Sequence, residues 1–181
     1  MHTHEGVAYE IAARDRIVYV NDAWNHFAHA NDGAELARDE VLNRSLWDFV
    51  SDPTTRELYR QVITRIRAGY EIKFNFRCDS PGCTRLLEMD VRPLGSHVRF
   101  ETRTIEVEPR EDVALLDRRQ PRSPAAVRMC AWCTRILAGD TWITFDEGIA
   151  RLGLLEAAAV PQLTHGICPE CYSQMQAMIT T

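Results

Sequence analysis

The sequence predicts an α+β fold, in which an antiparallel five-stranded sheet has helices on one face and is followed by a small, mostly helical metal-binding module. The order of the elements predicts the first part. Two β-rich runs, several helical segments and three further β-rich runs do not suit a parallel βαβ array. Two Cys-x-x-Cys pairs near the C-terminus predict the second part. The 181 residues, 45% of them hydrophobic, are enough for one domain of about 100 residues and a small appendage.

The first two strands are expected at residues 7–11 and 16–20, with a tight hairpin turn at 14–15 between them. Asn21 or Asp22 can cap the helix that follows, because both side chains accept hydrogen bonds from backbone N–H groups. One face of this helix carries apolar side chains at helical spacing, namely Trp24, Phe27 and Ala28.

A long amphipathic helix is predicted after short helical turns over residues 41–50. Asp52 is its expected N-cap, Pro53 takes the first helical position, and Gly69 closes its C-terminus. Its apolar stripe consists of Leu58, Tyr59, Val62, Ile63 and Ile66.

The hydrophobic period then changes to two, which indicates strands. Residues 72–77 alternate apolar and polar, a turn is expected at 79–82, and further strands are predicted at 86–91 and 97–107. These three strands form an antiparallel meander. Together with the first two strands they complete the predicted sheet.

The chain divides into three predicted parts: a first domain over 5–108, a linker over 109–126 and a cysteine module over 127–181. The linker is charged, bears prolines and has few residues that could bury, although a helical turn is expected around 113–116. In the last part, helices are predicted at 146–158 and from about Pro169 onward.

The four cysteines are predicted to hold a structural Zn²⁺ ion. Each Cys-x-x-Cys turn offers two thiolates, and two turns complete a closed tetrahedral Cys₄ sphere; these residues are Cys130, Cys133, Cys168 and Cys171. The 34 residues between the pairs exceed the common spacing of about 15–20, so the site must enclose folded structure. His165, three residues before Cys168, is a substitute ligand or a hydrogen-bonding neighbour of the site.

Other readings of the cysteines remain open. A thioredoxin-like motif would need a strand before Cys130 and a helix that begins at that pair, and it would leave the second pair unexplained. Cys78 and Cys83 flank the predicted turn at 79–82, where a hairpin could pair them, although two unrelated thiols are the favoured interpretation. Covalent haem attachment is excluded because no histidine follows either pair.

The net charge of −5 argues against binding driven by electrostatics to nucleic acid or to anionic membranes. The N-terminus shows no basic region followed by an apolar run, so neither a secretory signal nor a membrane span is expected, and the predicted location is cytoplasmic. A zinc-ribbon nucleic-acid binder stays an alternative because arginines gather around the linker, namely Arg118, Arg119, Arg122, Arg128 and Arg135.

Residues 5–108 resemble the PAS domain family. The likeness lies in the run 15–28, where a strand ends in Asn21 and an aromatic-bearing helix follows, and in Ser-Leu-Trp-Asp-Phe-Val at 45–50. The tail is similar to a short cysteine-rich module at the ends of some bacterial PAS and response-regulator proteins. The PAS resemblance implies a pocket between sheet and helices for an unidentified small molecule, which the chain's aromatic residues could line: Trp24, Phe27, Trp47, Phe49, Tyr59, Phe74, Phe76 and Phe100.

The predicted function is that of a non-enzymatic bacterial sensory or adaptor protein with a structural zinc site. It is expected to form a homodimer and to engage a protein partner in signalling. No nucleophile elbow, Walker loop or dinucleotide motif is present in the sequence, which agrees with a protein that is not an enzyme. A third hypothesis is a thiol redox sensor, in which oxidation releases zinc.

Overall fold

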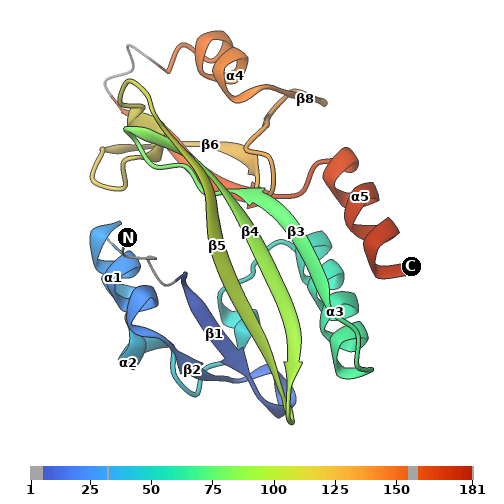
Figure 1. The fold of residues 1–181 in the computed structure, drawn as a ribbon. Coiled ribbons are helices and arrows are strands. Elements are labelled where there is room, and N and C mark those ends of the chain that lie inside the picture. The colour runs from blue at the N-terminus through green and yellow to red at the C-terminus, as the bar shows by residue number, and fades with distance from the viewer. Residues whose placement is uncertain (1–5, 32, 155–158, 181) are drawn as a thin grey trace.

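The computed structural model describes residues 6–31, 33–154 and 159–180. Its larger sheet has the order β2-β1-β5-β4-β3, and every neighbouring pair is antiparallel (Figure 1). The strands are β1 (Ala8–Ile11), β2 (Ile17–Val20), β3 (Ile72–Arg77), β4 (Cys83–Leu94) and β5 (His97–Pro109). The predicted five-stranded antiparallel sheet is therefore confirmed.

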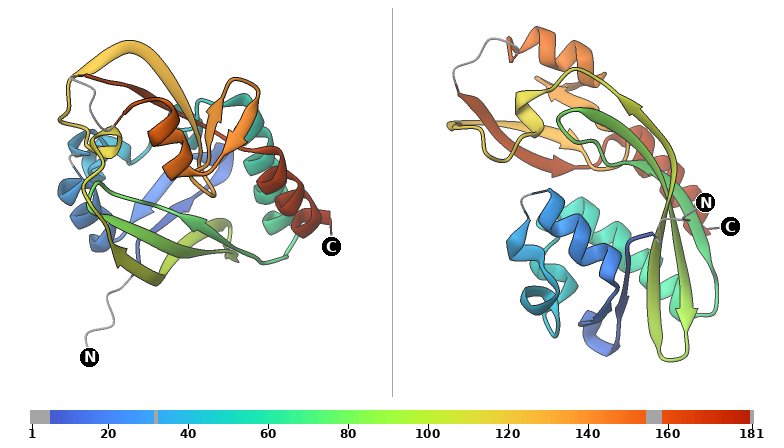
Figure 2. Two further views of the ribbon diagram at one scale, coloured as in Figure 1. Left: turned by 90° about the horizontal axis from the view of Figure 1, so that it is seen from above. Right: turned by 60° about the vertical axis from the view of Figure 1, so that its left-hand side comes forward.

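Helices α1 (Asp22–Ala30), α2 (Arg38–Val41) and α3 (Pro53–Arg67) connect β2 to β3. Figure 2 shows α1 and α3 on the same face of the sheet. Asn21 caps α1 by accepting a hydrogen bond from the Trp24 N–H, and its buried amide also bonds Ala8, which ties the helix to β1. Asp52 caps α3 as predicted, with Pro53 at the first helical position.

The tail differs from the predicted, mostly helical module because it contains a second sheet. This sheet has the order β8-β7-β6-β9 and is built from β6 (Arg122–Cys130), β7 (Ile136–Ala138), β8 (Thr141–Ile143) and β9 (Val160–Gly166). Helix α4 (Phe145–Arg151) follows β8, and α5 (Pro169–Thr180) ends the described chain. Of the helix predicted at 146–158, residues 155–158 lie outside the described residues.

The stretch 109–126, predicted as a linker, holds more structure than its composition suggests. Its helical turn forms over Ala114–Leu116, Leu115 is fully buried, and β6 already begins at Arg122. Leu115 belongs to a small core with Val127, Ile136 and other residues of the tail. Apolar contacts therefore fasten this stretch to the second sheet.

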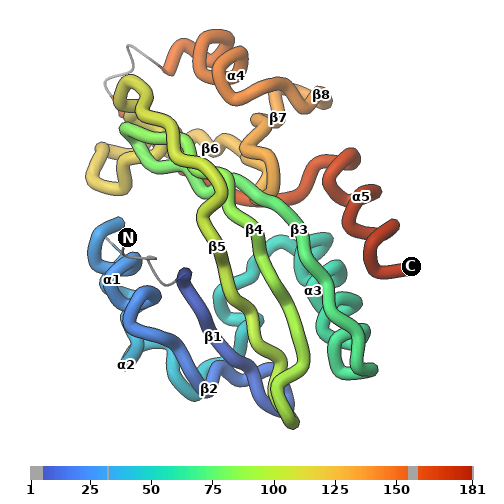
Figure 3. Tube along the Cα trace, viewed as in Figure 1, coloured from blue at the N-terminus to red at the C-terminus, as the bar shows by residue number. Residues whose placement is uncertain are grey.

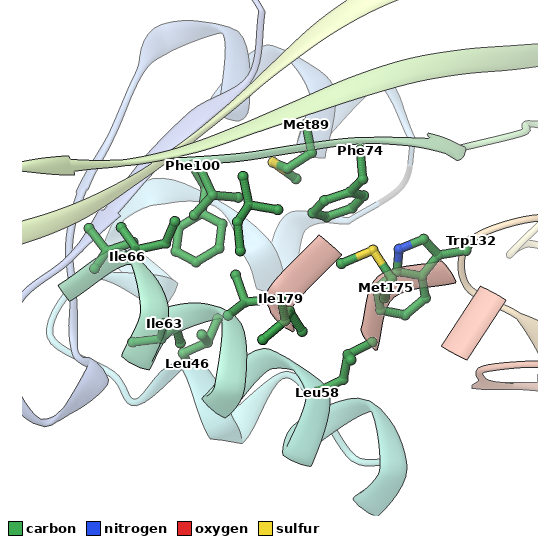
Figure 4. Close-up of a cluster of buried hydrophobic side chains, with 14 of the residues drawn as sticks. Leu46, Leu58, Ile63, Ile66, Phe74, Met89, Phe100, Trp132, Met175 and Ile179 are labelled. Carbon is green, nitrogen blue, oxygen red and sulfur yellow. The ribbon is translucent and has the colours of Figure 1, made fainter. Parts of the chain in front are cut away.

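The main core extends from the larger sheet into the tail. Figure 4 shows Phe74 and Phe100 of the sheet, residues of α3, and Trp132 and Met175 of the tail in one cluster. Helix α5 lies beside α3 in the trace of Figure 3, and the side chain of Gln176 donates a hydrogen bond to that of Gln61. The cysteine module therefore packs against the sheet and α3. Among the described residues, no helix combines the length and hydropathy needed to cross a membrane.

Candidate metal centre and the adjoining cavity

Parallel pairing between β6 and β9 brings the two cysteine pairs together. The register places Val127 opposite Leu163 and Cys130 opposite Gly166. The Ala131 N–H then donates a hydrogen bond of 2.8 Å to the Gly166 carbonyl, which extends the pairing into the first cysteine turn. The segment between β6 and β9 includes β7, β8 and α4, and it supplies the long connection that parallel strands require.

The first pair lies in a turn between β6 and β7, here named the first cysteine loop (residues 130–135). The Cys130 N–H bonds the Arg135 carbonyl at 2.8 Å, and the Thr134 N–H bonds the Cys130 carbonyl at 3.0 Å. Thr134 has a φ of 62°, a left-handed conformation that is uncommon for threonine and is held here by burial. The backbone thus curls around the two sulfur atoms.

The second pair lies at the start of α5. Cys168 precedes the helix, and Cys171 is in its first turn. The Cys171 N–H donates to the Cys168 sulfur at 3.5 Å, and the Cys168 N–H donates to the Cys130 sulfur at 3.4 Å. Backbone donors therefore reach sulfur atoms of both pairs.

The four sulfur atoms have a separation that suits one tetrahedral ion. All of them lie within 4.8 Å of one another, and Cys133 Sγ is 3.7 Å from Cys168 Sγ. Zn–S distances of about 2.3 Å place tetrahedral sulfur ligands about 3.8 Å apart, whereas a disulfide needs about 2.05 Å. The residues present therefore fit a closed zinc site.

The protonation of the crowded thiols favours a cation at this cluster. Hydrogen bonds from the Cys133 thiol and from nearby backbone N–H groups outweigh burial and lower the pKa of Cys130 to about 5. Burial and the charge of Cys130 raise the pKa of Cys171 to about 12. One sulfur thus ionises readily while a neighbour resists, because a second thiolate would face an uncompensated negative charge. A divalent ion bound among the four sulfur atoms would remove that repulsion.

His165 and the remaining cysteines lie outside the sulfur cluster. In the described part of the chain, the group of candidate ligands contains the four cysteines without His165. His165 instead borders a cavity next to the first cysteine loop. Cys78 and Cys83 are free thiols, and the Cys83 sulfur is 3.1 Å from the Ser80 hydroxyl.

A thioredoxin-like arrangement at the first pair does not occur. A strand precedes Cys130, but β7 follows the loop where that motif needs a helix. A helix does begin at the second pair, yet its sulfur atoms join those of the first pair. The geometry favours shared coordination over an isolated dithiol.

The five arginines that suggested a nucleic-acid site are all engaged within the protein. Four pair with a carboxylate: Arg118 with Glu35, Arg119 with Asp117, Arg128 with Asp52 and Arg135 with Glu170. Arg122 donates to the backbone carbonyls of Leu115, Asp117 and Pro161. These contacts argue against a free basic surface for phosphate groups.

A cavity of about 450 Å³, here named the central cavity, lies between the sheet, α3 and the tail. Four of the predicted pocket aromatics line it, namely Phe49, Tyr59, Phe74 and Phe76. The tail contributes Ala131, Trp132, Leu163, Thr164 and His165. The cysteine module thus lines this cavity together with the sheet and the helices.

The other predicted pocket residues lie elsewhere. Trp24 and Phe27 line a separate cavity of about 250 Å³ beside α1. Phe100 is fully buried in the core, and the Trp47 indole N–H donates to Asp15 at 2.9 Å. Trp47 and Phe100 therefore act in packing and local hydrogen bonding.

Sequence reasoning missed Trp132 and Tyr9 as cavity residues. Trp132 stands between Cys130 and Cys133, and its carbonyl accepts a 2.8 Å hydrogen bond from the Arg77 N–H of β3. A tryptophan inside a Cys-x-x-Cys pair was the available signal, since such a large apolar side chain needs a core to enter. Only the packing of the tail against the larger sheet and α3 shows that Trp132 enters the main core.

No protein-family model matches the chain, and no curated protein matches it either. Among solved structures, it is similar to the PAS domain of BvgS from Bordetella pertussis, with 20% identity and a TM-score of 0.43 over 56% of this chain and 77% of that one. The chain resembles PAS domains. A sensory box sensor histidine kinase from Vibrio cholerae matches at 11% identity and a TM-score of 0.41, over 57% of this chain and 85% of that one.

A PAS domain of an HTR-like protein from Haloarcula marismortui matches at 19% identity and a TM-score of 0.37, over 55% of this chain and 81% of that one. The α+β fold class rests on the protein's own five-stranded sheet and its covering helices.

Proposed function

We propose that this PAS-like protein is a non-enzymatic sensory or adaptor protein in which a structural Cys₄ zinc site holds the tail against the sheet. In this proposal, residues 5–108 form the sensory domain and residues 127–181 form the zinc module. The observation that carries it is the clustering of four sulfur atoms within 4.8 Å. Four sulfur ligands would fill the tetrahedral sphere and leave no position for water or substrate.

The shared core supports a signalling role for the module. Trp132 of the first cysteine loop contacts Tyr59 of α3 and Phe74 of β3, with ring centroids 5.9 Å and 6.0 Å apart. Met175 and Ile179 of α5 enter the same core. A change in the metal site would therefore alter the packing of the tail against the larger sheet. A homodimer, a protein partner and a cytoplasmic location belong to the proposal as well.

The metal is tested by measuring zinc in protein purified under reducing conditions, with Cys130→Ser as the test variant and Cys83→Ser as the control. Cys83 is also a partly buried thiol, but it lies outside the cluster. We expect one zinc ion per chain in the parent and in Cys83→Ser, and a loss in Cys130→Ser. Metal-free parent protein, or equal zinc in both variants, would contradict the proposal.

Removal of the metal should loosen a defined part of the chain. Binding of structural zinc supplies folding free energy directly, so chelation is expected to increase hydrogen exchange in residues 130–135 and 166–180. Strands β1 and β2, which lie at the far edge of the larger sheet, should be affected least. A uniform response across the chain, or none, would argue against a local zinc clasp.

The thiol redox sensor is the second candidate, favoured by the 3.7 Å separation of Cys133 and Cys168 sulfur atoms. Mild peroxide would then release zinc and consume thiols together, and a reductant with added zinc would restore both. An inert clasp would keep its zinc under the same treatment.

A further inference from the structure

The central cavity carries an inference that rests on the proposed sensory function and specifies its ligand. Its volume of about 450 Å³ is within the range of sites for small organic molecules. Most of the wall is apolar, with Phe74 and Met89 on the sheet side and Leu163 on the tail side. A ligand in this cavity would contact both the larger sheet and the first cysteine loop.

Trp132 brings a hydrogen-bond donor into this apolar wall. The side chain is 6% exposed, and its Nε1 atom belongs to the few buried side-chain atoms of the described residues that lack a hydrogen-bond partner. In Figure 4 the nitrogen lies on the edge of the indole that faces Phe74 and Met89, which line the cavity. Buried N–H groups nearly always have an acceptor, but this indole N–H has none among the described residues. It is therefore available to an acceptor atom of a ligand.

Two tyrosine hydroxyls add further donors. Tyr9 and Tyr59 both line the cavity, and within the described residues neither hydroxyl forms a hydrogen bond. Their rings pack on Phe100, with centroids 4.5 Å and 6.3 Å away. Burial raises the pKa of Tyr59 to about 12, and burial together with the nearby Tyr59 raises the pKa of Tyr9. Both phenols therefore stay protonated and able to donate at neutral pH.

The acidic residue that lines the cavity, Asp52, already accepts hydrogen bonds from the protein. The Asp52 carboxylate receives hydrogen bonds from the Thr55 N–H and hydroxyl, both at 2.8 Å, and from Arg128. A cationic ligand would thus meet free donors and an occupied carboxylate. The site favours a ligand that supplies acceptor oxygens.

We propose that the central cavity binds a small apolar molecule with a carboxylate or carbonyl oxygen, which accepts hydrogen bonds from Trp132 Nε1 and from the hydroxyls of Tyr9 and Tyr59. Trp132 stands between two zinc ligands, and its carbonyl holds the Arg77 N–H. Ligand binding would therefore alter the conformation of the first cysteine loop and of the end of β3.

The test compares two probes with one ring system, 1-naphthoate and 1-methylnaphthalene, on the full chain with its zinc content measured in the same sample. Tyr59→Phe and Trp132→Phe remove one donor each and keep an aromatic ring. Tyr19→Phe is the matched control, because Tyr19 is an exposed residue of β2 that does not line the central cavity. Binding is measured by calorimetry, and the indole N–H signals by ¹H–¹⁵N NMR.

We expect 1-naphthoate to bind at least about tenfold more tightly than 1-methylnaphthalene, since hydrogen bonds to a charged acceptor are strong. Each donor variant should reduce this preference severalfold, and Tyr19→Phe should leave it unchanged. The indole signal that disappears in Trp132→Phe should move downfield when 1-naphthoate is added to the parent.

Three results would overturn the inference: no binding of 1-naphthoate, equal affinity for the two probes, or an unmoved Trp132 signal. If any of these occurs in protein that contains one zinc ion per chain, the ligand inference fails while the zinc clasp stands. Protein without zinc that still prefers 1-naphthoate would contradict the proposed clasp and support the ligand site.

Discussion

Gly166 lies where the side chain of Arg128 crosses from β6 toward Asp52. A Cβ atom at position 166 would come within 2.3 Å of Arg128 Nε and 2.8 Å of Cζ, distances that real side chains do not adopt. Because the guanidinium is the end of a flexible side chain, Gly166→Ala is expected to displace it and not to break the strand. The displacement would separate Arg128 from Asp52, the N-cap of α3.

Two opposing effects determine the magnitude. A charge-assisted hydrogen bond contributes about 1.5–3 kcal/mol, and the 42% exposure of the Arg128 side chain reduces this to about 1 kcal/mol through solvent screening. Gly166 does not have a positive φ, so alanine fits its backbone and gains about 0.4–1 kcal/mol by restricting the unfolded chain. The net effect of the single substitution is therefore small.

A double-mutant cycle separates the two effects. With Arg128→Ala already present, Gly166→Ala should stabilise the protein by about 0.4–1 kcal/mol, because the three atoms nearest to the new Cβ all belong to the Arg128 side chain. In the parent background, the effect of Gly166→Ala on the free energy of unfolding should be less favourable by about 1 kcal/mol, because the contact between Arg128 and Asp52 is lost. Free energies of unfolding come from urea titrations at saturating zinc. Equal effects of Gly166→Ala in both backgrounds would refute the reasoning.

Three further changes test the packing and the charges. Ile179→Ala removes a buried side chain of α5 from the main core and should lower the free energy of unfolding in urea by about 2–4 kcal/mol. Met178→Ala, on the exposed side of α5, should lower it by less than about 0.5 kcal/mol. Equal losses would contradict the docking of α5. Gly148→Ala would place a Cβ 2.8 Å from Ile136, and about 1–3 kcal/mol of destabilisation is expected by the same assay. The pKa of Glu101 is lowered, since hydrogen bonds from Arg99 and Arg92 outweigh its burial. Its stabilising effect is therefore present at neutral pH and lost as pH falls from the ordinary carboxyl range through the lower folded-state pKa, so Glu101→Gln should flatten the acid decline of the urea midpoint.

Local chemistry explains why much of the larger sheet and its helices could be predicted. Asp52, Pro53 and the apolar stripe of α3 act within one helix, and the alternation in 72–77 is a property of one strand. The caps and periods of these segments need no distant partner. Their predicted bounds accordingly agree with the structure to within a few residues.

The tail was predicted less well because its strands depend on one another. β7 and β8 are three residues each, too short for a period of two to appear in the sequence. β6 begins inside the stretch read as a linker, and it is stabilised by parallel pairing to β9, more than 30 residues away. Such pairing leaves no local signal.

The sequence by itself determined the sulfur donor set, since two Cys-x-x-Cys pairs specify the ligand type wherever the chain places them. Tertiary structure alone decided that Trp132 enters the core beside Tyr59, and that the tail lines one side of the central cavity. The physical reason is that a metal site selects donor atoms by chemistry, whereas a cavity is defined by surfaces that meet only after β6, β9 and α3 have packed together.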